Sequence, residues 1–197
     1  MNFEVLDNLK KYDIILASGS PRRRELLGQL GFSFRVQTVD GIDESFPEGL
    51  SPQDTARHIS CAKAAAYKSV LQPNSLIITA DTIVCIDGDV LGKPAGAADA
   101  CRMLRRLSGR THQVVTAVTV LTSQRMETIA VTTDVVFSAL TDAEISHYVA
   151  TYNPLDKAGA YGIQEWIGMV AVESISGSYW NVIGLPVHQL YRLLKTF

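Results

Sequence analysis

The sequence has few cysteines and no long apolar run, and both absences exclude whole classes of protein. Its three cysteines, Cys61, Cys85 and Cys101, are widely spaced and form no CxxC pair, so neither a zinc site nor a disulfide framework is indicated. We expect each to pack as a small apolar residue. No apolar segment approaches transmembrane length, and residues 1–13 are too polar for a signal peptide. We therefore expect a cytoplasmic protein with no membrane partner.

The chain also lacks an excess of charge of either sign. Eighteen lysines and arginines face 20 aspartates and glutamates, which gives a formal net charge of -2. Such a balance argues against a general nucleic-acid or membrane-surface binder, so any affinity for a polyanion needs a local cluster of cations. The four histidines are scattered and form no HExxH pattern. We assign no catalytic role to them and expect His112, at the start of a strand, to be structural.

Apolar residues make up 47% of the chain, which is enough for a substantial core. Short runs rich in β-branched residues alternate with segments of helical period, and this alternation predicts an α/β fold. We expect a single domain over residues 1–197, because neither a repeat nor a Pro/Ser linker divides the sequence. Strands are expected at 14–17, 32–36, 76–79, 83–86, 90–91, 114–121, 128–137 and 169–174, and helices at 21–30, from 51, and at 97–107, 141–150 and 186–194.

The first feature that suggests chemistry is the stretch SGSPRRR at residues 18–24, between an expected strand and an expected helix. Ser20 suits the N-cap and Pro21 the first helical position. The arginines at 22–24 are unusual, because a helix N-terminus carries partial positive charge and favours acids. Exposed backbone N–H groups with arginines beside them form a phosphate cradle. The alternative is a basic turn that faces water.

Two further charged residues stand in apolar surroundings. Lys63 lies on the apolar stripe of its helix, where a lysine either extends its stem over the edge of the core or points into a cleft. Asp81 follows the expected strand at 76–79, and the carboxyl end of a strand is where α/β folds commonly present catalytic groups. An acid in that position can equally begin a turn.

Three weaker signals lie in loops. Lys93 sits in Gly92-Lys93-Pro94, a rigid turn after the Asp87-Gly88 hairpin signal. The acids Asp43 and Glu44 either hold a divalent metal or form a solvated loop. The segment 157–164 combines small residues with an aromatic ring and an amide, which permits close backbone approach to a ligand and recognition of a base.

Taken together, these segments resemble the Maf family of nucleotide pyrophosphatases, which are similar to septum-formation inhibitors. The resemblance spans nearly the whole chain in the right order. It is carried by SGSPRR at 18–23, Asp43-Glu44, CAKA around Lys63, ADT at 80–82, GKP at 92–94, LSGRTHQV at 107–114 and DKAGAYGIQ at 156–164.

The resemblance implies a fold related to inosine-triphosphate pyrophosphatases: an elongated mixed sheet flanked by helices, with a central cleft between two lobes. It implies hydrolysis of a nucleoside triphosphate between its α and β phosphates, dependent on a divalent cation such as Mg²⁺ or Mn²⁺. Asp81 corresponds to the acid that accepts a proton, and Glu44 and Asp81 are the expected metal ligands. A homodimer is expected by family analogy.

The resemblance also implies which side chains contact the substrate. Specificity is associated with Arg22, Thr82 and Gln164, whereas phosphate contacts correspond to Ser18, Arg23, Lys63 and Lys93. The form YGIQ at 161–164 looks like the branch of the family that acts on dTTP and UTP. Glu165-Trp166 departs from the small or apolar residues usual after this glutamine, and Trp166 could alter base stacking.

Two alternatives from other classes stay open at this point. A nucleotide-binding regulator of cell division and septum formation would use the same phosphate cradle without turning its ligand over. A nucleic-acid-binding module would use the arginines on backbone phosphates, although the negative net charge and the absence of a basic stripe argue against it.

Overall fold

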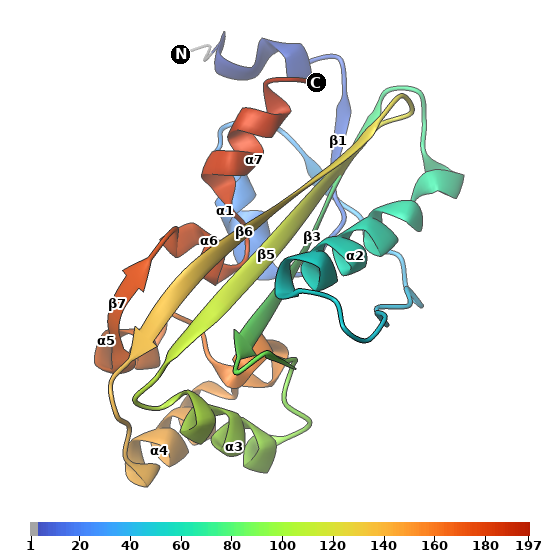
Figure 1. Ribbon diagram of the computed structural model, residues 1–197. Coiled ribbons are helices and arrows are strands. Elements are labelled where there is room, and N and C mark those ends of the chain that lie inside the picture. The colour runs from blue at the N-terminus through green and yellow to red at the C-terminus, as the bar shows by residue number, and fades with distance from the viewer. Residues whose placement is uncertain (1–3) are drawn as a thin grey trace. The chain divides into compact units, whose positions relative to one another are not determined.

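The computed structural model describes residues 4–197 and contains a seven-stranded mixed sheet (Figure 1). The strand order is β2-β1-β3-β5-β6-β7, and β4 pairs with β3. β1 is parallel to both β2 and β3, whereas β3–β4 and β6–β7 are antiparallel. This confirms the expected α/β fold with a mixed sheet. The strands are β1 (Asp13–Leu16), β2 (Arg35–Val36), β3 (Ser75–Ile86), β4 (Asp89–Leu91), β5 (Thr111–Leu121), β6 (Met126–Phe137) and β7 (Val172–Ser176).

Helices begin where the capping residues of the sequence predict. Ser20 and Ser51 cap their helices through the side chain, and Thr141 forms a capping box with Glu144. No helix among residues 4–197 is long and apolar enough to cross a membrane. The helices are α1 (Pro21–Gly28), α2 (Pro52–Ala65), α3 (Ala97–Leu107), α4 (Asp142–Tyr152), α5 (Trp166–Ala171), α6 (Tyr179–Ile183) and α7 (Val187–Leu194).

Four expected strands differ from the structure: those at 76–79 and 83–86 are one continuous strand, β3, and two others have different bounds. The strand expected at 32–36 shrinks to Arg35–Val36, because only these residues pair with β1, while the rings of Phe32 and Phe34 pack edge-on against each other. The strand expected at 169–174 begins at Val172, since the preceding residues form helix α5. Apolar runs this short fit a buried helix or a strand equally well, so periodicity alone could not separate them.

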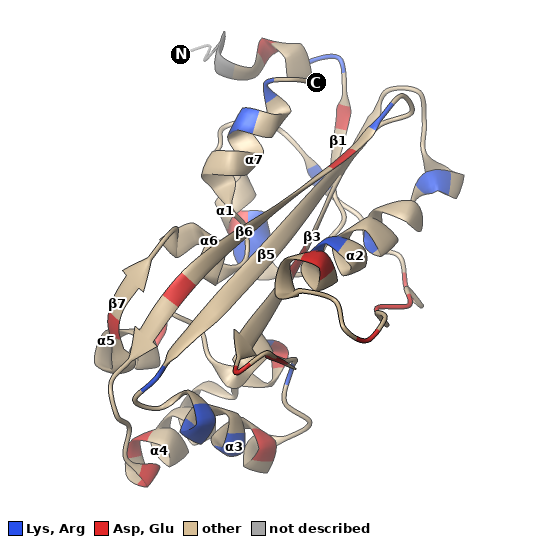
Figure 2. Cartoon of the chain, in the orientation of Figure 1, with Lys and Arg blue, Asp and Glu red and all other residues tan. Residues whose placement is uncertain are grey.

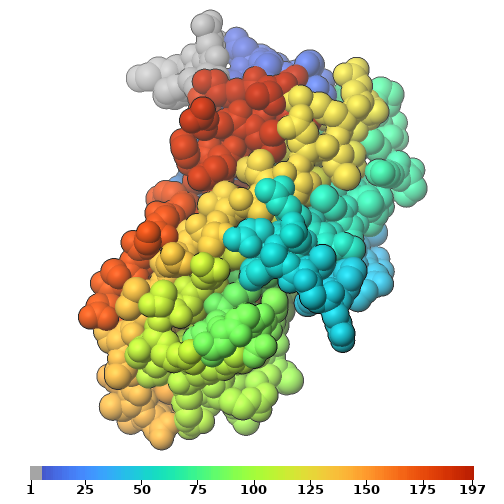
Figure 3. Space-filling view, viewed as in Figure 1, coloured from blue at the N-terminus to red at the C-terminus, as the bar shows by residue number. Residues whose placement is uncertain are grey.

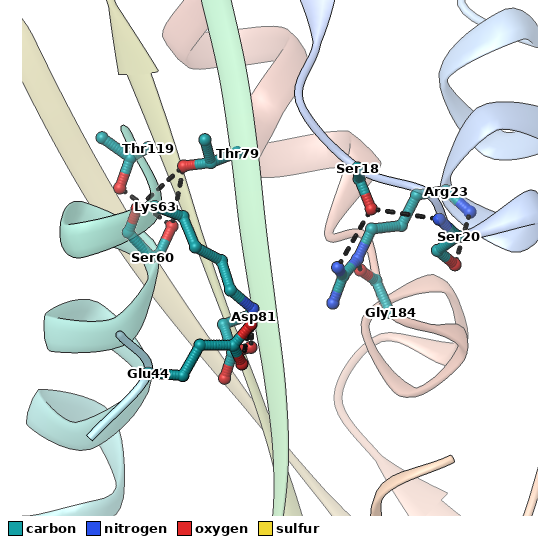
Figure 4. Close-up of polar contacts among 10 residues, drawn as sticks. All are labelled: Ser18, Ser20, Arg23, Glu44, Ser60, Lys63, Thr79, Asp81, Thr119 and Gly184. Carbon is teal, nitrogen blue, oxygen red and sulfur yellow. Dashed lines mark hydrogen bonds and ion pairs between the residues drawn. The ribbon is translucent and has the colours of Figure 1, made fainter. Parts of the chain in front are cut away.

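Residue contacts group the described chain into two compact units. The first unit comprises the described residues up to Asp81, with Thr116–Val131 and Gly184–Phe197. In this unit α1 and α2 lie on opposite sides of β3 (Figures 1 and 4). A small core of Ile15, Ile77, Leu121 and Tyr67 forms on the α2 side, and the exposed segment 43–51 leads into α2 (Figure 3).

The second unit comprises Thr82–Val115 and Thr132–Ile183. Its core contains the buried sides of α3 and α4, represented by Leu104 and Tyr148, together with Phe137 of β6. On α3 the acid Asp99 lies in the first turn and Arg105 and Arg106 lie in the last turn (Figure 2). The three cysteines are free; Cys85 is buried, and Cys61 and Cys101 are half-buried.

Candidate active site

The turn between β1 and α1 fixes a cation beside a helix N-terminus. The Ser20 side chain accepts a hydrogen bond from the Arg23 backbone N–H. Ser18 Oγ accepts from Ser20 N and from Arg23 Nη1, both at 3.3 Å, and Arg23 Nε donates to the carbonyl of Gly184 at 2.9 Å (Figure 4). The guanidinium of Arg23 is therefore held on two sides by the protein, and the helix N-terminus adds its partial positive charge.

The electrostatic surroundings of Arg23 tie this turn to two carboxylates. Burial lowers the pKa of Arg23 from its ordinary value; the charge of Asp81 opposes this effect, Arg22 reinforces it, and Glu44 opposes it. An arginine stays protonated in proteins at neutral pH despite such a shift. Ser18, Arg22 and Arg23 thus form a cationic turn in the field of Asp81 and Glu44.

A lysine bridges these two carboxylates. Lys63 Nζ of α2 lies 2.7 Å from Asp81 Oδ1 of β3 and 3.0 Å from Glu44 Oε2 of the loop before α2 (Figure 4). The side chains of Lys63 and Asp81 are 14% and 11% exposed, whereas Glu44 is 54% exposed. The ammonium group of Lys63 thus lies between two carboxylates.

Asp81 lies inside a strand, which corrects the expectation that it follows the end of one. β3 continues to Ile86, because residues beyond Asp81 pair with β4. The parallel pairing of β3 with β1, however, ends at Ile78 opposite Leu16. Ser18 and Asp81 both lie beyond the carboxyl end of this parallel pair, which is the position where open α/β sheets place ligands.

Buried hydroxyls fasten α2 to the sheet one turn before Lys63. Ser60 Oγ lies 2.9 Å from Thr119 Oγ1, and Thr79 Oγ1 donates to the Ser60 carbonyl at 2.8 Å (Figure 4). Thr119 also lies 2.8 Å from the hydroxyl of Thr128. Buried polar groups that satisfy one another in this way fix the relative position of two elements. Lys63 and Asp81 follow Ser60 and Thr79 on these two elements, so the network sets the geometry of the ion pair.

Glu44 and Asp81 form a donor set that fits magnesium. No group of three or more His, Cys, Asp or Glu side chains that could hold a metal occurs among residues 4–197. Mg²⁺ is usually held by one or two carboxylates together with substrate phosphates and water, so two carboxylates suffice. The neighbouring Asp43 has a local role: it accepts from the Ser45 backbone N–H at 2.9 Å, and this hydrogen bond lowers its pKa.

The remaining predicted residues, Thr82, Lys93 and Gln164, belong to the second unit. Thr82 is half-buried, and Lys93 and Gln164 are exposed. The carbonyl of Gly92 accepts from Gly159 N at 3.1 Å, which joins the turn of Lys93 to the segment that precedes Gln164. Gly159 has φ +67°, and a Cβ there would lie 2.9 Å from Val84, so both conformation and space require glycine.

The sequence patterns did not predict a role for several residues around this segment. Lys157 is buried with its Nζ 2.8 Å from Asp156 Oδ1 and 3.1 Å from Glu165 Oε1, and Tyr148 donates to the other oxygen of Glu165. The signal for Lys157 was its place in the motif DKAGAYGIQ. Tyr148 could have been recognised only as part of the apolar side of α4.

His112 has the structural role expected of it. Its Nε2 lies 2.8 Å from the hydroxyl of Tyr161, and its ring packs edge-on against Phe137 and Tyr161. Burial lowers the pKa of His112 to about 4, so the ring is neutral at pH 7. His112 thus fixes the start of the segment that carries Gln164.

A family model described as "Maf-like protein" matches residues 13–197. Similar curated proteins include one from Phocaeicola vulgatus, 53% identical over 97% of this chain and 99% of the relative, named "dTTP/UTP pyrophosphatase". A protein of the same name from Porphyromonas gingivalis (strain ATCC 33277) is 51% identical over 98% of both chains.

Among solved structures, the Ham1 protein of Staphylococcus aureus matches with a TM-score of 0.53 and 14% sequence identity, over 93% of this chain and 98% of the other. At this level of identity the likeness concerns the fold alone. It agrees with the fold class expected from the sequence.

Proposed function

Because the chain belongs to the Maf-like protein family, we propose that it hydrolyses dTTP and UTP to the nucleoside monophosphate and pyrophosphate. The observation that carries the chemistry is the Lys63 bridge between Asp81 and Glu44, in the field of a fixed Arg23. The substrate class is supported by relatives of 51–53% identity that are named dTTP/UTP pyrophosphatase.

Asp81 is the proposed general base. A water molecule attacks the α-phosphorus, a bond forms between the water oxygen and phosphorus, and the bond from phosphorus to the α–β bridging oxygen breaks. The carboxylate of Asp81 orients this water and accepts its proton, which requires hydrogen-bond reach. Pairing with Lys63 holds one oxygen of Asp81, at 2.7 Å, in a fixed direction.

Lys63 and Arg23 supply fixed positive charge for the triphosphate. Phosphoryl transfer depends chiefly on positioning and on the neutralisation of charge that builds up on phosphate oxygens. Lys63 can exchange its bond to the exposed Glu44 for one to a phosphate oxygen, and Arg23 is held by Ser18 and Gly184. Backbone N–H groups at the start of α1 add donors for phosphate oxygens.

A divalent cation, Mg²⁺ or Mn²⁺, is part of the proposal, with Glu44 and Asp81 as its ligands. When bound, it neutralises phosphate charge and stabilises the departing pyrophosphate. Thr82, Lys93, Gln164 and Arg22 enter the proposal through the family resemblance. Gln164 and Thr82 would read the base with Arg22, and Lys93 would contact phosphate; an amide suits a pyrimidine edge because it both donates and accepts.

The deciding experiment measures pyrophosphate release from dTTP, UTP, dCTP, dATP and GTP with and without Mg²⁺. We expect turnover of dTTP and UTP that stops when the metal is chelated. Tight nucleotide binding without pyrophosphate release would instead support the regulator of cell division. Salt-dependent binding to DNA or RNA, which we do not expect, would support the nucleic-acid module.

A further inference from the structure

The segment from Tyr161 to Glu165 folds back tightly on its own backbone. Gly162 N donates to the Tyr148 hydroxyl at 3.1 Å, and Glu165 N donates to the Gly162 carbonyl at 3.0 Å. A Cβ on Gly162 would lie 2.9 Å from Gln164 Nε2 and 3.0 Å from Glu165 Cδ. The Gln164 amide and the Glu165 carboxyl group therefore both lie against Gly162 and share the space beside it.

The carboxylate of Glu165 is held at both oxygens. Oε2 accepts a hydrogen bond from the hydroxyl of Tyr148, and Oε1 lies 3.1 Å from Lys157 Nζ. Both partners are buried, and the side chain of Glu165 is 20% exposed. Because Tyr148 also accepts from Gly162 N, the hydrogen bonds close a ring through the loop. Charge-assisted bonds of this kind are the strong ones among side chains.

The protonation state of Tyr148 fits this arrangement. Burial raises the pKa of its phenol, and the bond to the Glu165 carboxylate raises it further. The phenol therefore keeps its proton and acts as the donor. The Glu165 carboxylate lies between the phenol proton of Tyr148 and the ammonium group of Lys157.

The residues that follow fix the other end of the loop. Gly168 N donates to the Glu165 carbonyl at 2.9 Å, and a Cβ on Gly168 would lie 1.7 Å from the Ile163 carbonyl oxygen. The ring of Trp166 packs edge-on against His147 of α4, with centroids 5.1 Å apart. Trp166 thus contacts α4 in the structure, and Glu165 is the residue of the unusual pair that lies beside Gln164.

We propose that Glu165, held by Tyr148 and Lys157, is a positioning residue that fixes the Gln164 amide and thereby sets the preference among pyrimidine nucleotides. This inference rests on the proposed function, in which Gln164 reads the base. An exposed glutamine loses side-chain entropy when it binds a ligand, and a neighbour that restricts its position lowers that cost. Glu165 acts through Gln164 and does not itself contact the substrate.

The test compares dTTP with dCTP, because thymine presents an acceptor where cytosine presents a donor. For Glu165→Ala we expect the ratio of kcat/KM for dTTP over dCTP to fall about tenfold, chiefly through a higher KM for dTTP, as the loss of a charge-assisted hydrogen bond predicts. Glu165→Gln keeps an acceptor for Tyr148, so the ratio for this variant should fall less, by about threefold. Glu173→Gln, an exposed acid on β7, is the matched control and should leave the ratio unchanged.

A double-mutant cycle separates positioning from a general effect on folding. Gln164→Ala should lower the ratio by itself, and Glu165→Ala added to it should lower the ratio little further, since residues that act as a unit are not additive. Multiplicative effects in the cycle, or a lower melting temperature with an unchanged ratio, would overturn the proposal. The conservative Glu165→Gln variant keeps the test valid if the alanine variant folds poorly.

The proposed function is tested separately by the wild-type protein. If the wild type releases no pyrophosphate from dTTP, the proposed function fails. The positioning role is then tested by calorimetry. The binding affinities of the α,β-methylene analogues of dTTP and dCTP are measured for the wild type, for Gln164→Ala and Glu165→Ala, and for the double variant. A cycle that is additive in binding would overturn the positioning role as well.

Discussion

Each of the two units contains a lysine that bridges two carboxylates, and the two bridges differ in what surrounds them. Lys63 contacts Asp81 and Glu44 in the first unit, and Lys157 contacts Asp156 and Glu165 in the second. Glu44 stands on an exposed loop, so its bond to Lys63 can be exchanged for a ligand. Asp156 is exposed as well, but Glu165, the other partner of Lys157, is 20% exposed and is also held by the buried hydroxyl of Tyr148.

This difference shows that a trio of one lysine and two carboxylates can serve two purposes. The first trio holds a cation and two carboxylates that a triphosphate and a metal can use, and its exposed member, Glu44, contributes little to stability because it is solvated. In the second trio, Glu165 cannot give up Lys157 and Tyr148 without leaving a buried charge unpaired. We therefore expect variants of the first trio to change turnover and variants of the second to change stability and specificity.

The largest effect is expected for Asp81→Asn. The amide keeps the shape of the side chain but removes the base, so kcat should fall by about two orders of magnitude or more in a pyrophosphate-release assay. Asp40→Asn, an exposed acid in the loop that carries Glu44, is the control and should keep wild-type turnover. Normal turnover of dTTP by Asp81→Asn would remove Asp81 from the role of base.

The two lysines can be compared directly by replacing each with methionine. Lys63→Met should lower kcat/KM about 100-fold, and it should also cost about 2 kcal/mol in unfolding free energy because it leaves the buried Asp81 without its cation. Lys157→Met should cost about 2 kcal/mol in urea denaturation, because it leaves Glu165 without its buried cation. A 100-fold loss of kcat/KM in Lys157→Met as well would contradict the distinction between the two bridges.

His112 adds a pH dependence to the second unit. Its pKa is lowered by burial to about 4 in the folded protein, so the unfolded chain binds a proton first as pH falls below the ordinary value of 6.5. The contribution of neutral His112 is complete above pH 6.5 and is lost progressively as pH falls toward 4. The loss amounts to about 2–3 kcal/mol, measurable by urea denaturation at pH 7 and pH 4. His112→Gln should flatten this dependence, and an unchanged slope would show that other groups produce it.

The smallest effect is expected in the hydroxyl network behind Lys63. Thr119→Val keeps the volume and removes the partner of Ser60 and Thr128, which should cost about 1–2 kcal/mol of unfolding free energy. A few-fold drop in kcat should accompany it, because α2 then holds Lys63 less firmly. Thr151→Val, exposed on α4, controls for the substitution itself. Turnover equal to that of the control would show that the hydroxyl network does not position Lys63.

Much of the fold was readable from local signals. Ser20, Ser51 and the Thr141–Glu144 box marked helix starts, because a cap is decided by residues a few positions apart. The strand expected at 169–174 was wrong at its start, since Gly168 packs on a carbonyl that only the folded loop brings near. The unbroken course of β3 past Asp81 likewise depends on pairing with β4.

The sequence by itself determined the α/β alternation, the cationic turn at residues 18–24 and the family to which the chain belongs. The first two follow from spacing and residue type along the chain, and the family follows from the resemblance of its motifs. The partners of its charges were decided by tertiary structure: that Lys63 bridges Asp81 and Glu44, and that Glu165 is locked by Tyr148 and Lys157. The physical reason is that an ion pair joins residues far apart in sequence, and packing alone determines which of them meet and whether water reaches them.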